Sequence, residues 1–301
     1  MKIFLSSARI AIGALRVNKL RSALTMLGII IGVAAVIAMI SIGKGATERI
    51  EEQIASIGSN VIIVLPESIT ASGIRLGSGN AVTLTTDDAR AISTECSAVE
   101  ETAAAVRGGA QVVYGNNNWA TTIQGTTPEY LDIRDLHLVS GNVFSEQDVD
   151  SATKVALLGK TVVDNLFGTD DPVGQVIRIK KVPFTVLGVL EAKGQSPTGQ
   201  DQDDLIIIPL TTAKKKVLGG NQARANSVGT IMVQARGPES MSDAEDQMRT
   251  LLRQRHHLTA DQDDDFTVRN LEELFTAQET SAQVMSIACS LDTILHVRRR
   301  S

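Results

Sequence analysis

The chain has 301 residues, of which 43% are hydrophobic and 21% charged, a composition typical of a folded protein with room for one large or two ordinary domains. Five of its 29 Lys and Arg residues lie among the first 21 residues, which contain no Asp or Glu, so 24 basic residues stand against 34 acidic ones in the rest. This acidic balance argues against nucleic-acid binding by the main body, because proteins that bind DNA or RNA present a basic surface.

The start of the chain has the character of a membrane anchor. Leu24 to Ile42 is a run of 19 uncharged residues, which as a helix would cover about 29 Å, close to the thickness of the bilayer core. A cleaved signal peptide would have a shorter apolar core after a short basic start, so we expect a retained transmembrane helix over residues 22–43. The basic residues before it place the N-terminus in the cytoplasm and the body outside.

Two features flank or lie within this predicted span. Residues 1–21 carry apolar residues on one helical face and basic residues near the opposite one, which predicts either a cytoplasmic amphipathic helix along the membrane surface or a plain positively charged flank. Gly28 and Gly32 form a GxxxG pattern, a candidate for close helix packing in the membrane that the high glycine content of spans also produces by chance.

A stalk helix is predicted over residues 44–58. Apolar residues recur there at helical spacing, with charged residues between them, on a face formed by Ala46, Ile50, Ile54 and Ile57. No proline or turn cluster separates this segment from the span, so we expect a helix that leaves the membrane and transmits motion, which a Ser/Gly/Pro-rich tether would not do.

The body contains two segments with a strand–helix–strand pattern. In the first, NVIIVL is followed by the helix TTDDARAI, with Thr85 and Asp88 at capping-box spacing, and by the strand AQVVYG. In the second, VGTIMVQAR precedes the helix SDAEDQMRTLL, with Ser242 and Glu245 at capping-box spacing, and the strand DFTVR. We expect residues 59–120 and 213–279 to form one α+β subdomain.

The middle of the body, residues 121–212, is rich in strand patterns. QVIRIKK places Ile177 and Ile179 on one face and Arg178 and Lys180 on the other, and VPFTVLGVL follows after a short turn. LIIIPL is a further strand. The fold class predicted for the whole is therefore α+β, with a β-rich subdomain inserted into the α+β subdomain.

Motifs for nucleotide and metal binding are incomplete. Gly159-Lys160-Thr161 ends like a phosphate-binding loop, but Lys154 occupies the position of the first glycine. Asp261 to Asp265 lacks the glycine that a calcium-binding EF-hand loop needs at its sixth position, where Phe266 stands, and Asp201 to Asp204 lacks partners in the same way. We interpret the run from Asp261 to Asp265 as a solvated turn.

Catalytic constellations are also lacking. His256 and His257 adjoin at the end of a predicted helix, where neighbours do not share a face, so we interpret them as surface residues that compensate the helix dipole. Cys96 fits a small buried hydrophobic position better than a disulfide. The sequence therefore predicts no catalytic residue, no cofactor-binding residue and no metal ligand in this chain.

Several runs of sequence carry a family resemblance. SIGKGATERIEEQIASIGSNVIIVLP after the basic arm and span, LTTDDARAI, and DDDFTVRNLEEL resemble MacB-like (MacB/FtsX-type) ABC transporter permeases. The most specific part runs from Val155 to Ala213. The resemblance extends over roughly residues 1 to 285.

The resemblance implies an efflux permease in the bacterial inner membrane, with a periplasmic core domain after its first span. It further implies a homodimer or paired permease, a separate cytoplasmic ATPase subunit that binds ATP, and, for some members, a periplasmic adaptor protein and an outer-membrane channel. The stalk would then carry motion from the ATPase to the outer domain.

The tail, residues 280–301, departs from this family. Such permeases continue into three more spans, whereas the apolar run here is interrupted by Asp292 and His296 and is too short to cross a bilayer. We expect a product truncated before the later spans, whose transport competence is open. The alternative function is a single-pass, membrane-anchored binding module outside the cytoplasm, and an exported enzyme is the least favoured hypothesis.

Overall fold

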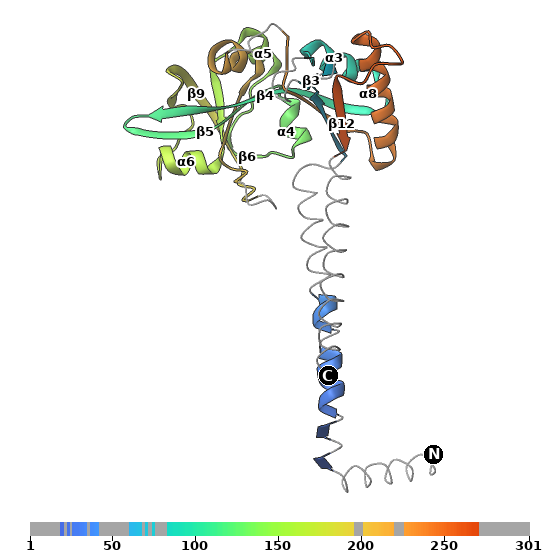
Figure 1. Ribbon diagram of the computed structural model, residues 1–301. Coiled ribbons are helices and arrows are strands. Elements are labelled where there is room, and N and C mark those ends of the chain that lie inside the picture. The colour runs from blue at the N-terminus through green and yellow to red at the C-terminus, as the bar shows by residue number, and fades with distance from the viewer. Residues whose placement is uncertain are drawn as a thin grey trace. The chain divides into compact units, whose positions relative to one another are not determined.

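A computed structural model gives the structure of the 301-residue chain (Figure 1). It divides the chain into two compact units, residues 1–52 and 53–301. The structure describes helical residues in the first unit and most of the second unit, and the described ranges are 19–20, 23–24, 26–34, 37–41, 60–67, 70–71, 74–75, 83–195, 201–219 and 226–270.

Every described residue of the first unit is helical and exposed. Among the residues that the structure describes, no helix is both long and apolar enough to cross a membrane. The transmembrane helix over residues 22–43 therefore stays a prediction. The stalk over residues 44–58, with Ala46, Ile50, Ile54 and Ile57, lies outside the described residues, as do residues 1–18 of the predicted amphipathic helix and the tail from residue 280.

Four antiparallel strands form one end of the main sheet of the second unit. Their order is β12 (Phe266–Asn270), β1 (Val61–Pro66), β11 (Thr230–Ala235) and β4 (Val99–Tyr114). These strands come from the first and last parts of the body. The sequence of β1, VIIVLP, is rich in Val and Ile, a composition that suits a pleated, buried surface. The predicted α+β class is confirmed.

Helices cover both faces of this four-stranded part. Ile62 and Val64 point to the face that packs with α3 (Thr86–Glu95) and α8 (Met241–Arg255) in the larger hydrophobic core. Val61, one residue along the strand, points to the opposite face and joins a smaller cluster with Ile133 of α4 (Glu129–Ile133). This alternation is the period of two that a strand imposes on its side chains.

The other strands close into a ring. The ring starts at β4, which pairs with β5 (Asn117–Thr126). It continues in the order β10 (Leu205–Pro209), β7 (Val155–Leu158), β9 (Val182–Leu190) and β8 (Val176–Ile179). β8 then pairs with β4 and closes the ring. The result is a six-stranded barrel in which long β4 belongs to both parts of the fold, while β6 (Leu138–Gly141) pairs with β9 beside the ring.

The barrel interior follows the predicted alternation. Ile177 and Ile179 of β8 are fully buried, as are Phe184 of β9 and Val112 of β4, whereas Arg178 between the two isoleucines is exposed. Val112 lies directly opposite Ile179 where the ring closes. Closure thus buries one face of every strand without leaving an open edge along the ring.

Short helices complete this part of the body. They are α5 (Glu146–Ser151), α6 (Lys160–Leu166), α7 (Leu210–Thr212) and the π-helix η1 (Ala213–Leu218). Gly125 on β5 lets η1 approach, since a side chain there would collide with Ala213 and Val106. A 3₁₀ turn, η3 (Pro238–Ser240), precedes α8, and β2 (Thr70–Ala71) and β3 (Ile74–Arg75) form a separate two-stranded sheet.

The two predicted capping boxes have different outcomes. The box at α3 is confirmed, because the Thr85 side chain caps the helix and Asp88 reaches back to the Thr85 backbone. The box of Ser242 and Glu245 at α8 is wrong, because η3 starts the helical turn earlier and leaves Ser240 at the N-cap, without a side-chain bond. A cap set by the chain before a helix cannot be recognised from the helix alone.

The subdomain boundary predicted at residue 121 falls inside β5, whose ladder with β4 runs without interruption from Tyr114↔Asn117 to Ala105↔Thr126. One continuous sheet therefore links residues 59–120 and 213–279 with residues 121–212. The division into two subdomains remains a prediction.

Candidate functional site

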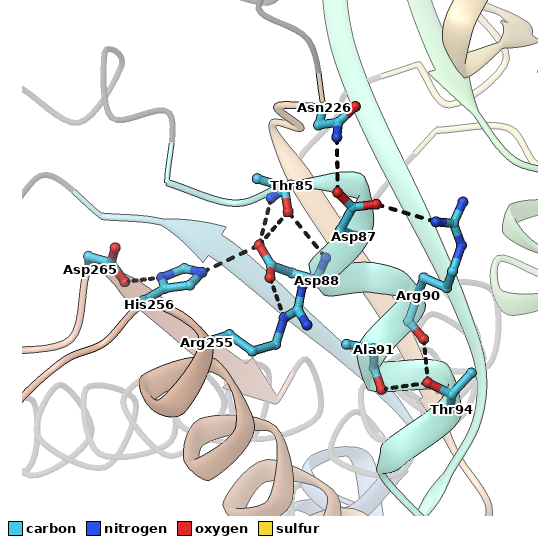
Figure 2. A network of polar contacts seen from close by, with 10 residues as sticks. All are labelled: Thr85, Asp87, Asp88, Arg90, Ala91, Thr94, Asn226, Arg255, His256 and Asp265. Atoms are coloured by element: carbon cyan, nitrogen blue, oxygen red, sulfur yellow. Dashed lines mark hydrogen bonds and ion pairs between the residues drawn. The ribbon is translucent and has the colours of Figure 1, made fainter.

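The most extensive buried polar network of the described body joins the first turn of α3 to the end of α8 and the start of β12 (Figure 2). Its centre is formed by Asp88, His256 and Asp265. Residues far apart in sequence meet here because α3 and α8 pack against each other and β12 returns beside them.

The α3 capping box places the Asp88 carboxylate. Thr85 stands at the N-cap with an extended backbone, and its Oγ1 donates to Asp88 Oδ2 at 2.7 Å while the Asp88 N–H donates to Thr85 Oγ1 at 3.2 Å. The Thr85 N–H also donates to Asp88 Oδ2, at 3.0 Å. A carboxylate at the N-terminus of a helix is further favoured by the helix dipole.

His256 lies between the two carboxylates. Its Nδ1 is 2.6 Å from Asp265 Oδ1 and its Nε2 is 3.4 Å from Asp88 Oδ2, and only 9% of its side chain is exposed. On the other side of Asp88, the Arg255 Nε donates to Oδ1 at 2.7 Å. Two cations from the end of α8 thus face two anions (Figure 2).

The charges of the network reinforce one another. The hydrogen bond to Asp265, followed by that to Asp88, outweighs burial and raises the pKa of His256 from 6.5 to about 9. Burial alone would raise the pKa of Asp88, but hydrogen bonds from His256, Thr85 and Arg255 outweigh it and hold that pKa well below the ordinary value. At neutral pH the network is therefore an ion cluster with a protonated imidazole.

This geometry does not fit known catalytic arrangements. The hydroxyl of Thr85 donates to the Asp88 carboxylate and does not contact the imidazole, and the lowered pKa of Asp88 makes that carboxylate a weak base. No group of three or more His, Cys, Asp or Glu residues in the described ranges is arranged to hold a metal ion. The ion cluster instead joins three elements of the fold.

A second polar cluster fixes the ends of the loop between β9 and β10. Asp203, which is buried, accepts backbone N–H bonds from Lys193 at 2.7 Å and Gly194 at 2.9 Å. Asp201 accepts from the Thr161 hydroxyl at 2.7 Å, and Asp204 accepts from the Trp119 indole at 2.8 Å. All three carboxylates therefore accept hydrogen bonds from groups of the same chain.

Two hollows lie on the described surface of the body. One, of about 380 Å³, lies between α3 and α8 and includes Glu95, Cys96 and Asp246. The other, of about 470 Å³, lies over the β4–β5 ribbon near Gly109 and Thr122. In the first hollow, burial and the neighbouring Glu95 raise the pKa of the Cys96 thiol, which disfavours a reactive thiolate.

The structure corrects two sequence interpretations. His256 is not a surface residue, because packing of α8 on α3 and β12 buries it against two carboxylates. Asp265 is buried rather than solvated, and its neighbour Asp264 pairs with Arg253. In the other acidic run, Asp203 accepts hydrogen bonds from backbone N–H groups. The capping-box spacing was the one sequence signal that pointed to part of the network, through Asp88.

Other predicted positions lie as follows. Cys96 is buried and free, as expected of a small core residue. Lys160, the lysine of the incomplete phosphate-loop motif, pairs with Asp164 at 2.5 Å on the exposed face of α6. Gly28 and Gly32 lie in the described helical residues 26–34, with no other side chain or distant backbone within 4 Å of where a Cβ would stand, and their packing role stays a prediction.

Comparison with known proteins identifies the family. The model of the MacB-like periplasmic core domain matches residues 22–251, most of the chain. The chain belongs to the MacB-like periplasmic core domain family. Among curated members, the macrolide export ATP-binding/permease protein MacB of Syntrophobacter fumaroxidans is 37% identical over 94% of this chain and 46% of its own length. That of Bdellovibrio bacteriovorus is 35% identical over 91% of the chain and 41% of its own length. The chain thus spans less than half of these relatives.

Solved structures show the same fold as this MacB-like domain. The periplasmic region of MacB from Actinobacillus actinomycetemcomitans has a TM-score of 0.61 at 24% identity and covers 77% of this chain and 98% of its own. The extracellular domain of the noncanonic ABC-type transporter YknZ from Gram-positive bacteria has a TM-score of 0.55 at 18% identity, over 70% of this chain and 100% of its own. The predicted family resemblance is confirmed.

Proposed function

We propose that this chain is a permease component of an ABC-type exporter, in which the MacB-like body moves in response to a separate cytoplasmic ATPase. The observation that carries the proposal is the family match over residues 22–251, which includes the predicted span as well as the body. The curated relatives named above are macrolide export ATP-binding/permease proteins, so macrolides are the first substrate class to test.

We place the chain in the bacterial inner membrane, with its N-terminus in the cytoplasm and the body in the periplasm. The basic arm before the predicted span supports this orientation. A homodimer or paired permease would complete the membrane part, and a periplasmic adaptor protein with an outer-membrane channel would complete the export route. ATP would bind to the ATPase subunit, and no cofactor is proposed for this chain.

The proposed work of the body is mechanical rather than catalytic. β1 is the first and β12 the last described strand of the main sheet, and Ile62 and Asn270 are directly paired. The start of β1 and the end of β12 therefore lie at the same end of one antiparallel pair. Because the sheet continues through β4 into the barrel, displacement of this pair would move the body as a unit.

The test uses a strain from which the gene has been deleted. We expect a lower minimal inhibitory concentration for a macrolide, restored by expression of the gene but not when the nucleotide-binding lysine of the cognate ATPase is replaced. Alkaline phosphatase fused after Asn270 should be active and a fusion to the N-terminus inactive. Unchanged macrolide tolerance together with an inactive fusion after Asn270 would contradict both the export role and the orientation.

A further inference from the structure

The edge strand β12 is held by a small ladder. It pairs over five residues with β1, its single strand partner among the described residues, and of its residues Phe266 alone is fully buried. A short edge strand with few buried side chains belongs to the least protected parts of a fold. Contacts beyond the ladder are therefore important for keeping it in place.

These contacts concentrate just before β12. The Asp265 carbonyl oxygen accepts hydrogen bonds from the Glu67 N–H at 2.8 Å and from the Thr83 hydroxyl at 2.9 Å, while its carboxylate contacts His256. Asp264 forms an ion pair with Arg253. The start of β12 is thus attached to the end of β1, the segment before α3, and α8.

Among the described residues, His256 is the one side chain that contacts both buried carboxylates. Asp88 faces it from α3, Asp265 faces it from the start of β12, and the Phe266 ring lies edge-on at 5.8 Å between ring centres. Arg255, which precedes His256 at the end of α8, donates to the other carboxylate oxygen of Asp88, Oδ1. A protonated imidazole donates to both carboxylates, whereas a neutral one has a single N–H and leaves one carboxylate without its donor.

We propose that Asp88, His256 and Asp265 form an ionic latch that keeps β12 docked on α3 and α8, and that loss of the proton from His256 releases β12 while the rest of the body stays folded. Residues 271–301 follow β12 in the sequence, so the latch acts on the last described strand before them. This inference is independent of the export role, because it depends only on the contacts around His256.

Hydrogen–deuterium exchange of the full-length chain in detergent tests the latch. At pH 7.5, His256→Asn should accelerate exchange about tenfold or more in peptides covering residues 264–270, with a smaller increase in residues 61–66, because a buried carboxylate loses its cationic partner. Peptides covering residues 155–166 of the barrel should be unchanged.

His257→Asn is the matched control. His257 is exposed and has a positive φ of 56°, a conformation that Asn adopts readily, so exchange should stay at the wild-type level. In the wild type, raising the pH from 7.5 to 10 should release the same peptides after correction for the intrinsic exchange rate, which gives a test even if His256→Asn fails to fold. Exchange in His256→Asn equal to that in His257→Asn, an even loss of protection across the body, or no local release at pH 10 would each overturn the latch.

Discussion

The unfolding free energy of the body should change with pH because of one buried histidine, His256. In the folded chain the pKa of His256 is raised from 6.5 to about 9, mainly by its hydrogen bond to Asp265. A group whose pKa is higher in the folded state stabilises that state fully below its unfolded pKa, and the contribution is lost as the pH rises through the folded value. The loss should therefore occur between about pH 6.5 and pH 9.

The size of the effect follows from the shift. At about 1.4 kcal/mol for each pKa unit, the displacement of His256 corresponds to roughly 3 kcal/mol of unfolding free energy between the ends of this pH range. This is an upper limit, because Arg255 at the edge of the network is 33% exposed in its side chain and water screens the cluster there. Replacing His256 by Asn should abolish this pH-dependent contribution.

Urea unfolding, monitored by circular dichroism at pH 6.0, 7.5 and 9.5, measures this contribution of His256 to the unfolding free energy. The difference in unfolding free energy between the wild type and His256→Asn should shrink by about 2 to 3 kcal/mol from pH 6.0 to pH 9.5, whereas the difference for His257→Asn should stay constant. Because the wild type and the variant share the same Lys and Tyr residues, the contribution of those residues cancels in the difference between the two unfolding free energies. A difference for His256→Asn that does not vary with pH would refute the assignment of a protonated imidazole to the network.

Three further predictions concern the barrel, the helix caps and the stalk. Phe184→Ala, at a fully buried barrel position, should lower the unfolding free energy by about 3 to 5 kcal/mol. In this variant the fluorescence of Trp119, which reports on the barrel, and the hydrogen exchange of the α8 amides should still change in one unfolding transition. Separate transitions would contradict a continuous sheet. Thr85→Ala should cost about 1 kcal/mol in urea unfolding and Ser242→Ala much less, and equal costs would argue against the observed caps. In a strain where expression of the gene restores macrolide tolerance, Ile54→Pro should abolish that tolerance and Ile54→Ala should retain it, with membrane insertion checked by fractionation; unchanged tolerance in the proline variant would contradict a rigid stalk.

The local elements of the body could be predicted from sequence because their causes are local. The alternation of Ile177 and Ile179 with charged residues predicts a half-buried strand, and the spacing of Thr85 and Asp88 predicts the start of α3; both are confirmed. The start of α8 was predicted wrongly, because the preceding 3₁₀ turn at Pro238 competes with the Ser242 pattern. Where two local signals compete, tertiary context selects between them.

The sequence by itself determined the strand and helix types of the body, its acidic balance and its family, since periodicity, composition and runs of sequence that resemble the family need no knowledge of distant contacts. Only the tertiary structure decided that β8 meets β4 to close a barrel and that His256 lies between Asp88 and Asp265. Those three residues are separated by up to 177 positions, and a pair of adjacent histidines has the same local pattern on the surface as in a buried network. Burial and the charge of the neighbours, which the packing of α3, α8 and β12 creates, decide whether such a histidine carries a proton at neutral pH.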